Sequence, residues 1–302
     1  MDIKSMTTET RNQNSCNLDM LSPLEICRLM NKEDEKVAAQ VHEVLPQIAE
    51  AITWVTDSLR KGGRLIYIGA GTSGRLGLLD AVECPPTFGT PDYMVQGLMA
   101  GGNQAFIKAV EGAEDNSQMG AEDLRSINLT SADTVIGIAA SGRTPYVIGG
   151  LKYARETGCK TAAIACNKNS AVGKVADTAI EVIVGPEVLT GSTRLKAGTA
   201  QKMILNMIST ASMVGIGKVY QNLMVDVMQT NEKLHTRAEN IVMAVTSASR
   251  EQVKEVLLQA DGNVKTAIVM LLLDMDAESA GQKLKQSDGH IRNAIETRRS
   301  QK

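Results

Sequence analysis

The residues best suited to chemistry lie in three short turns that combine glycine with hydroxyl side chains. They are Thr72 and Ser73 in the first turn, Ser141, Gly142, Arg143 and Thr144 in the second, and Gly191-Ser192-Thr193-Arg194 in the third. Hydroxyl groups beside the free N–H groups at the start of a helix bind anions, phosphate in particular. Helix capping explains one hydroxyl in a turn but not a cluster. The pattern therefore predicts a site for a phosphorylated ligand.

A dinucleotide-binding site is the main alternative, because residues 69–74 match GxGxxG between an expected strand and an expected helix. That interpretation needs an acidic residue at the end of the second strand, where the sequence has Ala100-Gly101-Gly102, and Asp92 lies before the strand instead. No Gly-Lys-Ser/Thr run closes the loop, which excludes a Walker motif. A phosphosugar site uses both Ser-Gly-Arg turns, whereas a dinucleotide site leaves the second one unexplained.

Carboxylates are the other groups that could move protons. Glu83 lies just before Pro85-Pro86, which we expect to end the helix that follows the first turn. At the negative end of a helix dipole the protonated form of a carboxylate is weakly favoured, and burial would have to do most of the work of making it an acid. Glu114 stands in an acidic group with Glu111 and Asp115, and local sequence alone does not distinguish it from solvated surface.

Composition excludes several classes of protein. The chain has 302 residues, of which 43% are hydrophobic, and a formal net charge of -2, so neither nucleic acid nor a membrane surface is an expected partner. Five cysteines without CxxC spacing and three distant histidines predict neither disulfides nor a metal site. With no apolar stretch that could span a bilayer and no signal-like N-terminus, we expect a cytoplasmic protein.

Alternating strand and helix patterns predict the fold class, an α/β domain with a doubly wound, mainly parallel five-stranded sheet. The expected strands cover 64–68, 94–99, 134–139, 161–165 and 179–184. Each is a short apolar run typical of a strand buried on both faces. The first two hydroxyl-rich turns follow neighbouring strands, so we expect them to meet at the switch point of the sheet. On the helix after the first turn, the pairs Leu76 with Leu79 and Leu78 with Val82 are expected to face inward.

The segment before the sheet is expected to contain a polar arm and two helices. Residues 1–20 have no periodic apolar pattern, which on its own favours a frayed terminus. Ser22, Pro23 and Glu25 form a capping-box pattern that predicts a helix start, and a second helix is expected over about 34–60.

The segment after the sheet is expected to be helical throughout. A long helix over about 197–218 has a methionine-rich stripe, typical of a core face, and is apolar on enough of its surface to meet another subunit as well. From about 240 on, amphipathic helices predict a compact module. The predicted domains are 1–60, the arm and helices; 61–238, the sheet domain; and 239–302, the C-terminal module.

Long runs of this sequence resemble the N-acetylmuramic acid 6-phosphate etherase family, which includes glucokinase-regulator-like proteins and uses a sugar isomerase (SIS) domain. The runs are TETRN at 8–12, GGRLIYIGAGTSGRLGLLDAVECPPTFG at 62–89, EGAED at 111–115, GIAASGRTPYVIGGL at 137–151, GPEVLTGSTRLKAGTAQK at 185–202 and NLMVDV at 222–227. The C-terminal module is similar to ubiquitin-associated-type helical domains.

The resemblance implies an enzyme that cleaves the ether between the sugar's third carbon and D-lactate, as a homodimer without metal or cofactor. Carried over by position, Glu83 matches the family's proton donor and Glu114 its second catalytic carboxylate. The phosphosugar-binding positions are Thr72, Ser73, Ser141, Gly142, Arg143 and Thr144. With a dimer in view, residues 8–20 become a lid over a site.

Two other functions remain open at this stage. A non-catalytic phosphosugar sensor on the same fold needs only the phosphate-binding turns, so the presence of both Glu83 and Glu114 counts against it. An aldose–ketose isomerase uses the same proton abstraction without a leaving group. For the etherase, we expect Glu83 to protonate the departing lactate and Glu114 to remove the proton from carbon 2.

Overall fold

The computed structural model describes residues 6–108, 110–227 and 232–296. The chain forms two compact units. One comprises Met1–Val82 and Tyr93–Ser209 and contains the sheet; the other comprises Glu83–Asp92 and Thr210–Lys302 and is mostly helical. The domain limits expected from the sequence stay a prediction.

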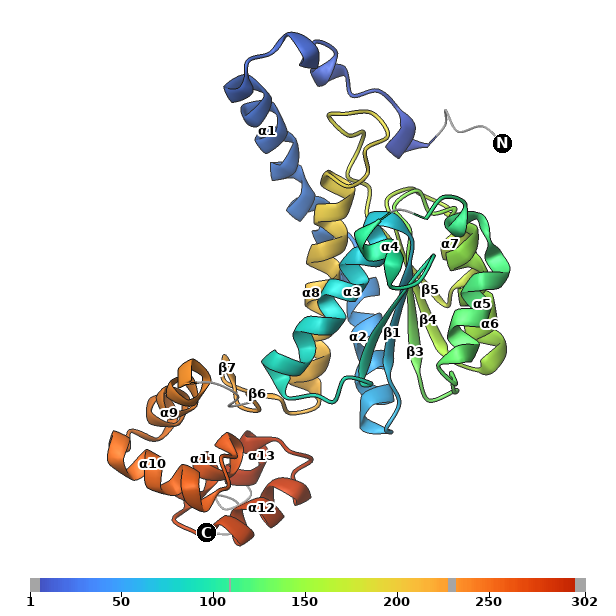
Figure 1. Ribbon diagram of the computed structural model, residues 1–302. Coiled ribbons are helices and arrows are strands. Elements are labelled where there is room, and N and C mark those ends of the chain that lie inside the picture. The colour runs from blue at the N-terminus through green and yellow to red at the C-terminus, as the bar shows by residue number, and fades with distance from the viewer. Residues whose placement is uncertain (1–5, 109, 228–231, 297–302) are drawn as a thin grey trace. The chain divides into compact units, whose positions relative to one another are not determined.

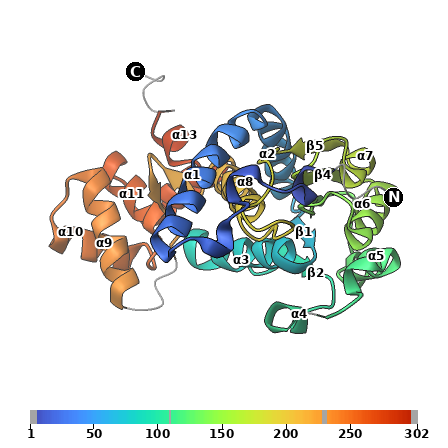
Figure 2. The same ribbon diagram turned by 90° about the horizontal axis from the view of Figure 1, so that it is seen from above.

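The sheet has five parallel strands in the order β2-β1-β3-β4-β5, which confirms the predicted fold class. The strands are β1 (Leu65–Gly69), β2 (Val95–Met99), β3 (Thr134–Ile138), β4 (Lys160–Ala165) and β5 (Thr178–Glu181). The helices around it are α2 (Leu45–Arg60), α3 (Gly71–Phe88), α4 (Gln104–Ile107), α5 (Ser117–Ser126), α6 (Pro145–Thr157), α7 (Ala171–Val175) and α8 (Lys196–Gly215). Figures 1 and 2 show α2, α3 and α8 on one face and α5, α6 and α7 on the other, which explains why every residue of β1 and β3 is buried.

The face of α3 against β1 is made of small residues, and the predicted inward face was wrong for Leu79 and Val82, whereas Leu76 and Leu78 are half-buried. A Cβ atom on Gly74 would lie 2.7 Å from the carbonyl oxygen of Gly69, and one on Gly77 would lie 2.9 Å from Cβ of Tyr67. Leu79 and Val82 are instead 39% and 61% exposed. At Gly74 and Gly77 the helix lies so close to β1 that only glycine fits, and Leu79 and Val82 lie on the outer face.

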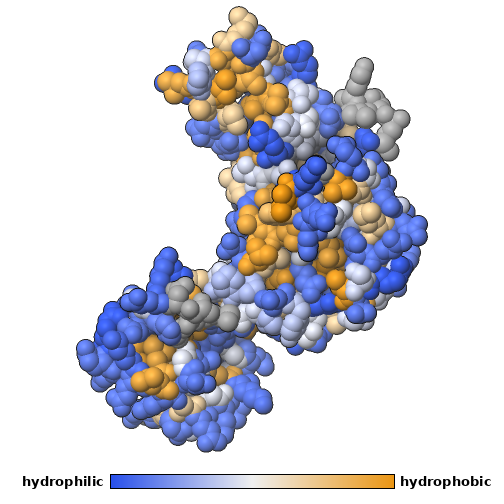
Figure 3. All heavy atoms as spheres, in the orientation of Figure 1, coloured by the Kyte–Doolittle hydropathy of each residue, from blue (hydrophilic) through white to orange (hydrophobic). Residues whose placement is uncertain are grey.

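Hydrophobic side chains therefore gather on the surface over α3, as Figure 3 shows on the face seen in Figure 1. Phe106 and Ile107 of the short helix α4 are also exposed. Helix α4 covers only Gln104–Ile107, and residue 109 lies outside the described residues.

Pro85 and Pro86 do not end α3, contrary to the sequence-based expectation. The helix continues through both prolines to Phe88, and the N–H of Gly89 closes it by donating to the carbonyl oxygen of Pro85 at 2.9 Å. Both prolines stand in the last turn and already have a helical φ, so they remove donors without breaking a long run of helix. Glu83 consequently lies more than one turn inside the helix.

The helices before the sheet are α1 (Pro23–His42) and α2 (Leu45–Arg60). The predicted capping box is confirmed: the Glu25 backbone N–H donates to Oγ of Ser22, and the Ser22 backbone N–H donates to Oε2 of Glu25. The break expected near residue 34 was wrong, because the chain breaks at 43–44 instead. Pro46 determines that position, since proline is tolerated in the first turn of a helix but not in its interior.

In its described residues the second unit contains a hairpin and five helices around its own core. Its elements are β6 (Val219–Tyr220), β7 (Leu223–Met224), α9 (Glu232–Thr246), α10 (Arg250–Gln259), α11 (Val264–Leu273), α12 (Ala277–Gln286) and α13 (Ile291–Glu296). Asp226 joins the hairpin end to the helices through ion pairs with Lys218 at 3.1 Å and Lys265 at 2.6 Å. Within the described residues no single helix is long and apolar enough to span a membrane, and one pair, α10 with α11, passes that test jointly by length and composition but is bent by 115°.

Candidate active site

The first two hydroxyl-rich turns lie side by side at the carboxyl edge of the sheet. β1 and β3 are hydrogen-bonded neighbours, and Gly69 at the end of β1 is in register with Ile138 at the end of β3. From β1 the chain goes to β2 on one side and later returns to β3 on the other, so the sheet order reverses between these two strands. Crevices at such switch points are where open α/β sheets bind ligands, and the predicted convergence of the two turns is confirmed.

Ser73 is held in the first turn by α8. Its hydroxyl donates to Oε1 of Gln201 at 3.0 Å, and both side chains are buried. Among the described residues, Nε2 of Gln201 has no hydrogen-bond partner. Gly71 begins α3 with a φ of +54°, the left-handed conformation that glycine adopts at least cost. The helix N-terminus, the Ser73 hydroxyl and the amide of Gln201 thus gather at one end of the sheet.

The second turn uses its hydroxyl groups only partly for its own backbone. The Arg143 backbone N–H donates to Oγ of Ser141 at 3.3 Å, and Gly142 has a φ of +74° with no room for a side chain against Ser170. Thr144 occupies the N-cap position of α6 but makes no side-chain capping bond within the described chain. Simple helix capping therefore does not explain this turn, which leaves hydroxyl groups for a ligand.

Asn167 clamps the N-terminal arm onto the second turn. Its Nδ2 donates to Oγ1 of Thr8 at 3.0 Å and to the carbonyl oxygen of Ser141 at 3.2 Å, while its Oδ1 accepts from the Thr8 backbone N–H at 3.3 Å. Arg143 also reaches the sulfur of Met6. The frayed terminus that sequence alone favoured is wrong for the described part of the arm, which has three short 3₁₀ turns and buries Thr8, Asn12 and Ser15.

Glu114 lies between the two turns. Its side chain is exposed in the short 3₁₀ turn Ala113–Asp115 and lines two hollows. One, of about 250 Å³, is shared with Ala70, Gly71 and Arg75 of the first turn. The other, of about 1110 Å³, is shared with the arm and with the second turn, including Ser141, Arg143 and Thr144. A carboxylate that local sequence could not single out thus lines hollows shared with both predicted phosphate-binding turns.

Glu83 is exposed on α3 and belongs to the second compact unit. The rise of an α-helix puts it about 18 Å along the axis from Gly71, far from the first turn of its own chain. It lies on the helix face of Leu79 and Val82, because residues three and four apart share a face. The pairing of Glu83 with Glu114 stays a prediction.

The third turn is anchored by a buried ion pair. Nζ of Lys196, at the start of α8, lies 2.7 Å from Oε2 of Glu33 on α1, and both side chains are almost completely buried. Glu187, which is fully buried, accepts hydrogen bonds at 3.0 Å from the backbone N–H groups of Lys196 and Ala197 and so caps α8. The loop between Gly185 and Lys196 is thereby tied to α1 at one end and to α8 at the other.

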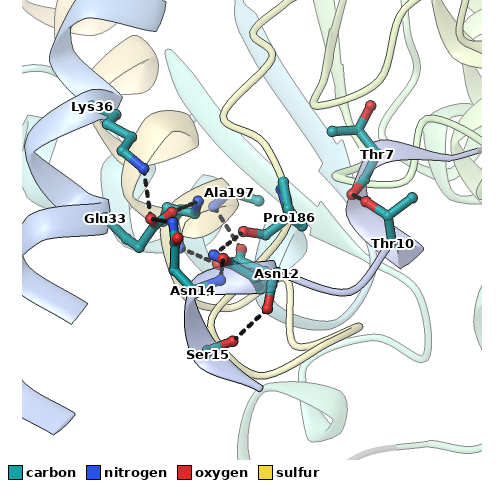
Figure 4. Close-up of polar contacts among 11 residues, drawn as sticks. Thr7, Thr10, Asn12, Asn14, Ser15, Glu33, Lys36, Pro186 and Ala197 are labelled. Carbon is teal, nitrogen blue, oxygen red and sulfur yellow. Dashed lines mark hydrogen bonds and ion pairs between the residues drawn. The ribbon is translucent and has the colours of Figure 1, made fainter. Parts of the chain in front are cut away.

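Two asparagines of the arm bind in this region, Asn14 at the ion pair and Asn12 at the loop before α8, as Figure 4 shows. Nδ2 of Asn14 donates to Oε1 of Glu33 at 3.2 Å, and Nδ2 of Asn12 donates to the carbonyl oxygen of Pro186 at 3.2 Å. Burial alone would raise the pKa of Glu33, but hydrogen bonds from Lys196, Lys36 and Asn14 outweigh it and lower the pKa to about 2. Burial raises the pKa of Glu187, against the lowering effect of its two backbone hydrogen bonds.

Sequence reasoning missed Glu33, Asn167, Glu187, Lys196 and Gln201. Except for Glu187, which binds the nearby start of α8, their partners lie far away in the chain, as between Thr8 and Asn167, so no local spacing could have identified them. A signal was present for Lys196 and Glu187, because both stand in a run that was singled out only for its hydroxyl groups. Among the described residues no group of three or more His, Cys, Asp and Glu side chains is placed to hold a metal ion. The absence of metal and cofactor stays a prediction.

Comparison with known protein families identifies the domains of this chain. Residues 47–155 match the model of the glucokinase regulatory protein N-terminal SIS domain, residues 117–211 the SIS domain, and residues 221–261 the C-terminal lid domain of glucokinase regulatory protein. Among solved structures, a phosphoheptose isomerase from Neisseria gonorrhoeae is similar at 15% identity and a TM-score of 0.48, over 63% of this chain and 98% of the other. The two family matches over 47–211 identify the sheet with its paired turns as a SIS domain.

Close relatives define the particular family. N-acetylmuramic acid 6-phosphate etherases are 60% identical in Bacillus mycoides, over 91% of this chain and 93% of the relative, and 58% identical in Cronobacter sakazakii, over 93% and 94%. A third, N-acetylmuramic acid 6-phosphate etherase 2 of Lactiplantibacillus plantarum, is 59% identical over 93% and 95%. The chain belongs to the N-acetylmuramic acid 6-phosphate etherase family, which confirms the resemblance seen in its sequence motifs.

Replacing Lys196 by Met tests the buried ion pair. The change leaves Glu33 buried without its main partner, and removal of one member of such a pair costs about 3–5 kcal/mol of unfolding free energy. Lys36→Met is the matched control: Lys36 also contacts Glu33, but its side chain is 50% exposed, so it should cost at most about 1 kcal/mol. Urea unfolding at pH 7 measures both, and equal losses would contradict the assignment.

The pH dependence of the same pair has a defined sign. Because folding lowers the pKa of Glu33, its contribution to stability is complete above its ordinary value of 4.5 and is lost as the pH falls toward about 2. The stability difference between the parent and Lys196→Met should therefore shrink between pH 4.5 and pH 2.

Proposed function

We propose that the protein cleaves the D-lactyl ether of N-acetylmuramic acid 6-phosphate and releases N-acetylglucosamine 6-phosphate and D-lactate. The observation that carries this proposal is the position of Glu114, which lines hollows shared with both hydroxyl-rich turns. Membership of the etherase family supports the same reaction. The step belongs to amino-sugar recycling, because its product is an ordinary amino-sugar phosphate.

The 6-phosphate is bound by the two turns at the switch point. Helices α3 and α6 both begin there, and the hydroxyl groups of Thr72, Ser141 and Thr144 supply donors. The Ser73 hydroxyl donates to Gln201 and so positions the first turn. Arg143 adds a positive charge at the same edge. Such a site holds the phosphate equally in the ground state and the transition state, so its contribution is binding and orientation.

The reaction needs one base and one acid. In the open-chain sugar, the hydrogen on carbon 2 is acidic because carbon 1 is an aldehyde. A base removes that proton, the C–H electron pair forms a double bond between carbons 2 and 3, and the bond from carbon 3 to the lactate oxygen breaks as this oxygen takes a proton from the acid. Water then adds, with its oxygen on carbon 3 and a proton on carbon 2. We assign Glu114 as the base and Glu83 as the acid.

The complete site requires two copies of the chain. Glu83 lies about 18 Å along α3 from the first turn of its own chain, too far to act on a sugar whose phosphate is bound there. Glu83 shares its helix face with Leu79 and Val82, whose exposure leaves apolar surface for a second copy to cover. We infer a homodimer in which each site combines the turns and Glu114 of one subunit with Glu83 of the other.

Incubation of the purified protein with N-acetylmuramic acid 6-phosphate tests the function directly. Free D-lactate and N-acetylglucosamine 6-phosphate should appear in equal amounts. A sensor would bind the substrate without releasing lactate, and an isomerase would change the sugar while the ether stays intact; either result would reject the proposal.

Solvent deuterium distinguishes the two carboxylates. Proton abstraction brings deuterium to carbon 2 even when lactate does not leave, so Glu83→Ala should lose lactate release and keep exchange. Glu114→Ala should lose both, because no proton is removed. NMR of the recovered substrate reads the exchange. Exchange that survives only in the Glu114 variant would reverse the roles, and loss in both variants would mean that the pair acts as one unit.

Mixing the two inactive variants tests the shared site. A hybrid of one Glu83→Ala and one Glu114→Ala subunit has one site with both carboxylates intact and one with neither, so random exchange of subunits should restore about a quarter of the parent's activity. The separate variants, treated in the same way, provide the baseline. Absence of recovery, when mass analysis shows that hybrids have formed, would place both carboxylates in one chain.

A further inference from the structure

The N-terminal arm brings a third carboxylate, Glu9, into the large hollow. Glu9 follows Thr8, which makes two hydrogen bonds with Asn167. Asn167 in turn donates to the carbonyl oxygen of Ser141. Its side chain lines the hollow of about 1110 Å³ together with Glu114. Its Oε2 lies 3.6 Å from the position that a Cβ atom on Gly191 would occupy. Glu9 thus projects from the clamped arm toward the third turn.

The carboxylate of Glu9 does not stabilise the fold through a polar contact with any described residue. Its carboxylate makes no hydrogen bond and no ion pair with any described residue, although it is only partly exposed. Other polar groups of the arm are committed to structure: Asn12 holds the Pro186 carbonyl, and Thr10 donates to the carbonyl oxygen of Thr7. A partly buried carboxylate without donors is incompletely solvated, and a ligand that brings donors would satisfy it.

The donors must come from the sugar and not from the phosphate. An ionised carboxylate accepts hydrogen bonds and donates none, and it repels a phosphate dianion. The sugar has neutral donors, its hydroxyl groups and its acetamido N–H. The hollow that Glu9 lines also contains the second turn, with Ser141 and Arg143, and the carboxylate of Glu114, so the sugar of a phosphate bound at that turn extends into the hollow where Glu9 lies.

We propose that Glu9 determines specificity by accepting a hydrogen bond from an N–H or O–H donor of the bound sugar, and that the clamp of Thr8 by Asn167 positions it. This inference rests on the proposed function for the identity of the sugar. In this proposal the N-terminal arm contributes a side chain to the sugar-binding site.

Calorimetric binding of N-acetylglucosamine 6-phosphate and of inorganic phosphate tests the proposal without requiring turnover. Glu9→Ala should weaken binding of the sugar phosphate by roughly 10- to 100-fold, the usual effect of losing a hydrogen bond to a charged group, and leave phosphate binding unchanged. Glu9→Gln, whose amide oxygen still accepts, should have a smaller effect. Ser141→Ala is the reference for the phosphate-binding turns and should weaken both ligands.

Asp19→Ala is the matched control, because it removes an exposed carboxylate from the same arm. It should bind both ligands like the parent. In Glu9→Ala, equal weakening of both ligands would show that the arm has merely moved. Tighter binding of inorganic phosphate would show that Glu9 faces the phosphate. Unchanged binding of the sugar phosphate would show that Glu9 does not contact the sugar. Each of these three results would overturn the proposal.

A sugar phosphate without a donor at carbon 2 identifies the group that Glu9 accepts from. If Glu9→Ala no longer weakens binding when the ligand is 2-deoxyglucose 6-phosphate, the donor to Glu9 is the acetamido N–H. If the weakening persists, the donor is a hydroxyl group of the sugar. Both results support the contact. If the parent releases no D-lactate from N-acetylmuramic acid 6-phosphate, the proposed function fails, while the comparison of the two ligands still decides whether Glu9 contacts the sugar.

Discussion

The buried ammonium group of Lys196 imposes the constraint on which the site depends. An ammonium group on a side chain that is only 2% exposed is stable only beside an opposite charge, and Glu33 of α1 supplies that charge at 2.7 Å. This contact fixes α1 against the first turn of α8. Since Gln201 of α8 accepts the Ser73 hydroxyl, the position of α8 in turn determines where the hydroxyl of the first turn lies. A pair of charges outside the sheet thus orders a ligand-binding turn.

The same network explains how a polar arm can be ordered. Few residues of the arm bury apolar surface, so its position comes from directed hydrogen bonds instead. Asn14 binds the carboxylate of Glu33, Asn12 binds a carbonyl oxygen in the third-turn loop, and Thr8 binds Asn167 beside the second turn. These bonds lead along the arm from the start of α8 to the large hollow. Loss of the ion pair would therefore reach the hollow through the arm as well as through α8.

Features encoded by neighbouring residues could be predicted, and those that depend on distant partners could not. The five strands and the capping box at Ser22 follow from local patterns, and their parallel order brings the two Ser-Gly-Arg turns together. The buried face of α3 was missed because apolar spacing says nothing of how closely β1 approaches Gly74. Lys196 and Asn167 were missed because their partners are 163 and 159 residues away in sequence. Roles for Glu83 and Glu114 came from family resemblance and not from spacing.

The outer face of α3, which carries apolar side chains beside Glu83, connects the fold to the proposed chemistry. Glycines lie against the sheet, so Leu79, Val82 and Glu83 share the outward face. Apolar side chains at this density on one helix face are stabilised when another surface covers them. In the proposed dimer that cover also removes water from Glu83. A carboxylate that loses its hydration favours the protonated form, which is the form that a proton donor to departing lactate requires. The surface that drives association would then also prepare the acid, so that catalysis depends on the assembled dimer.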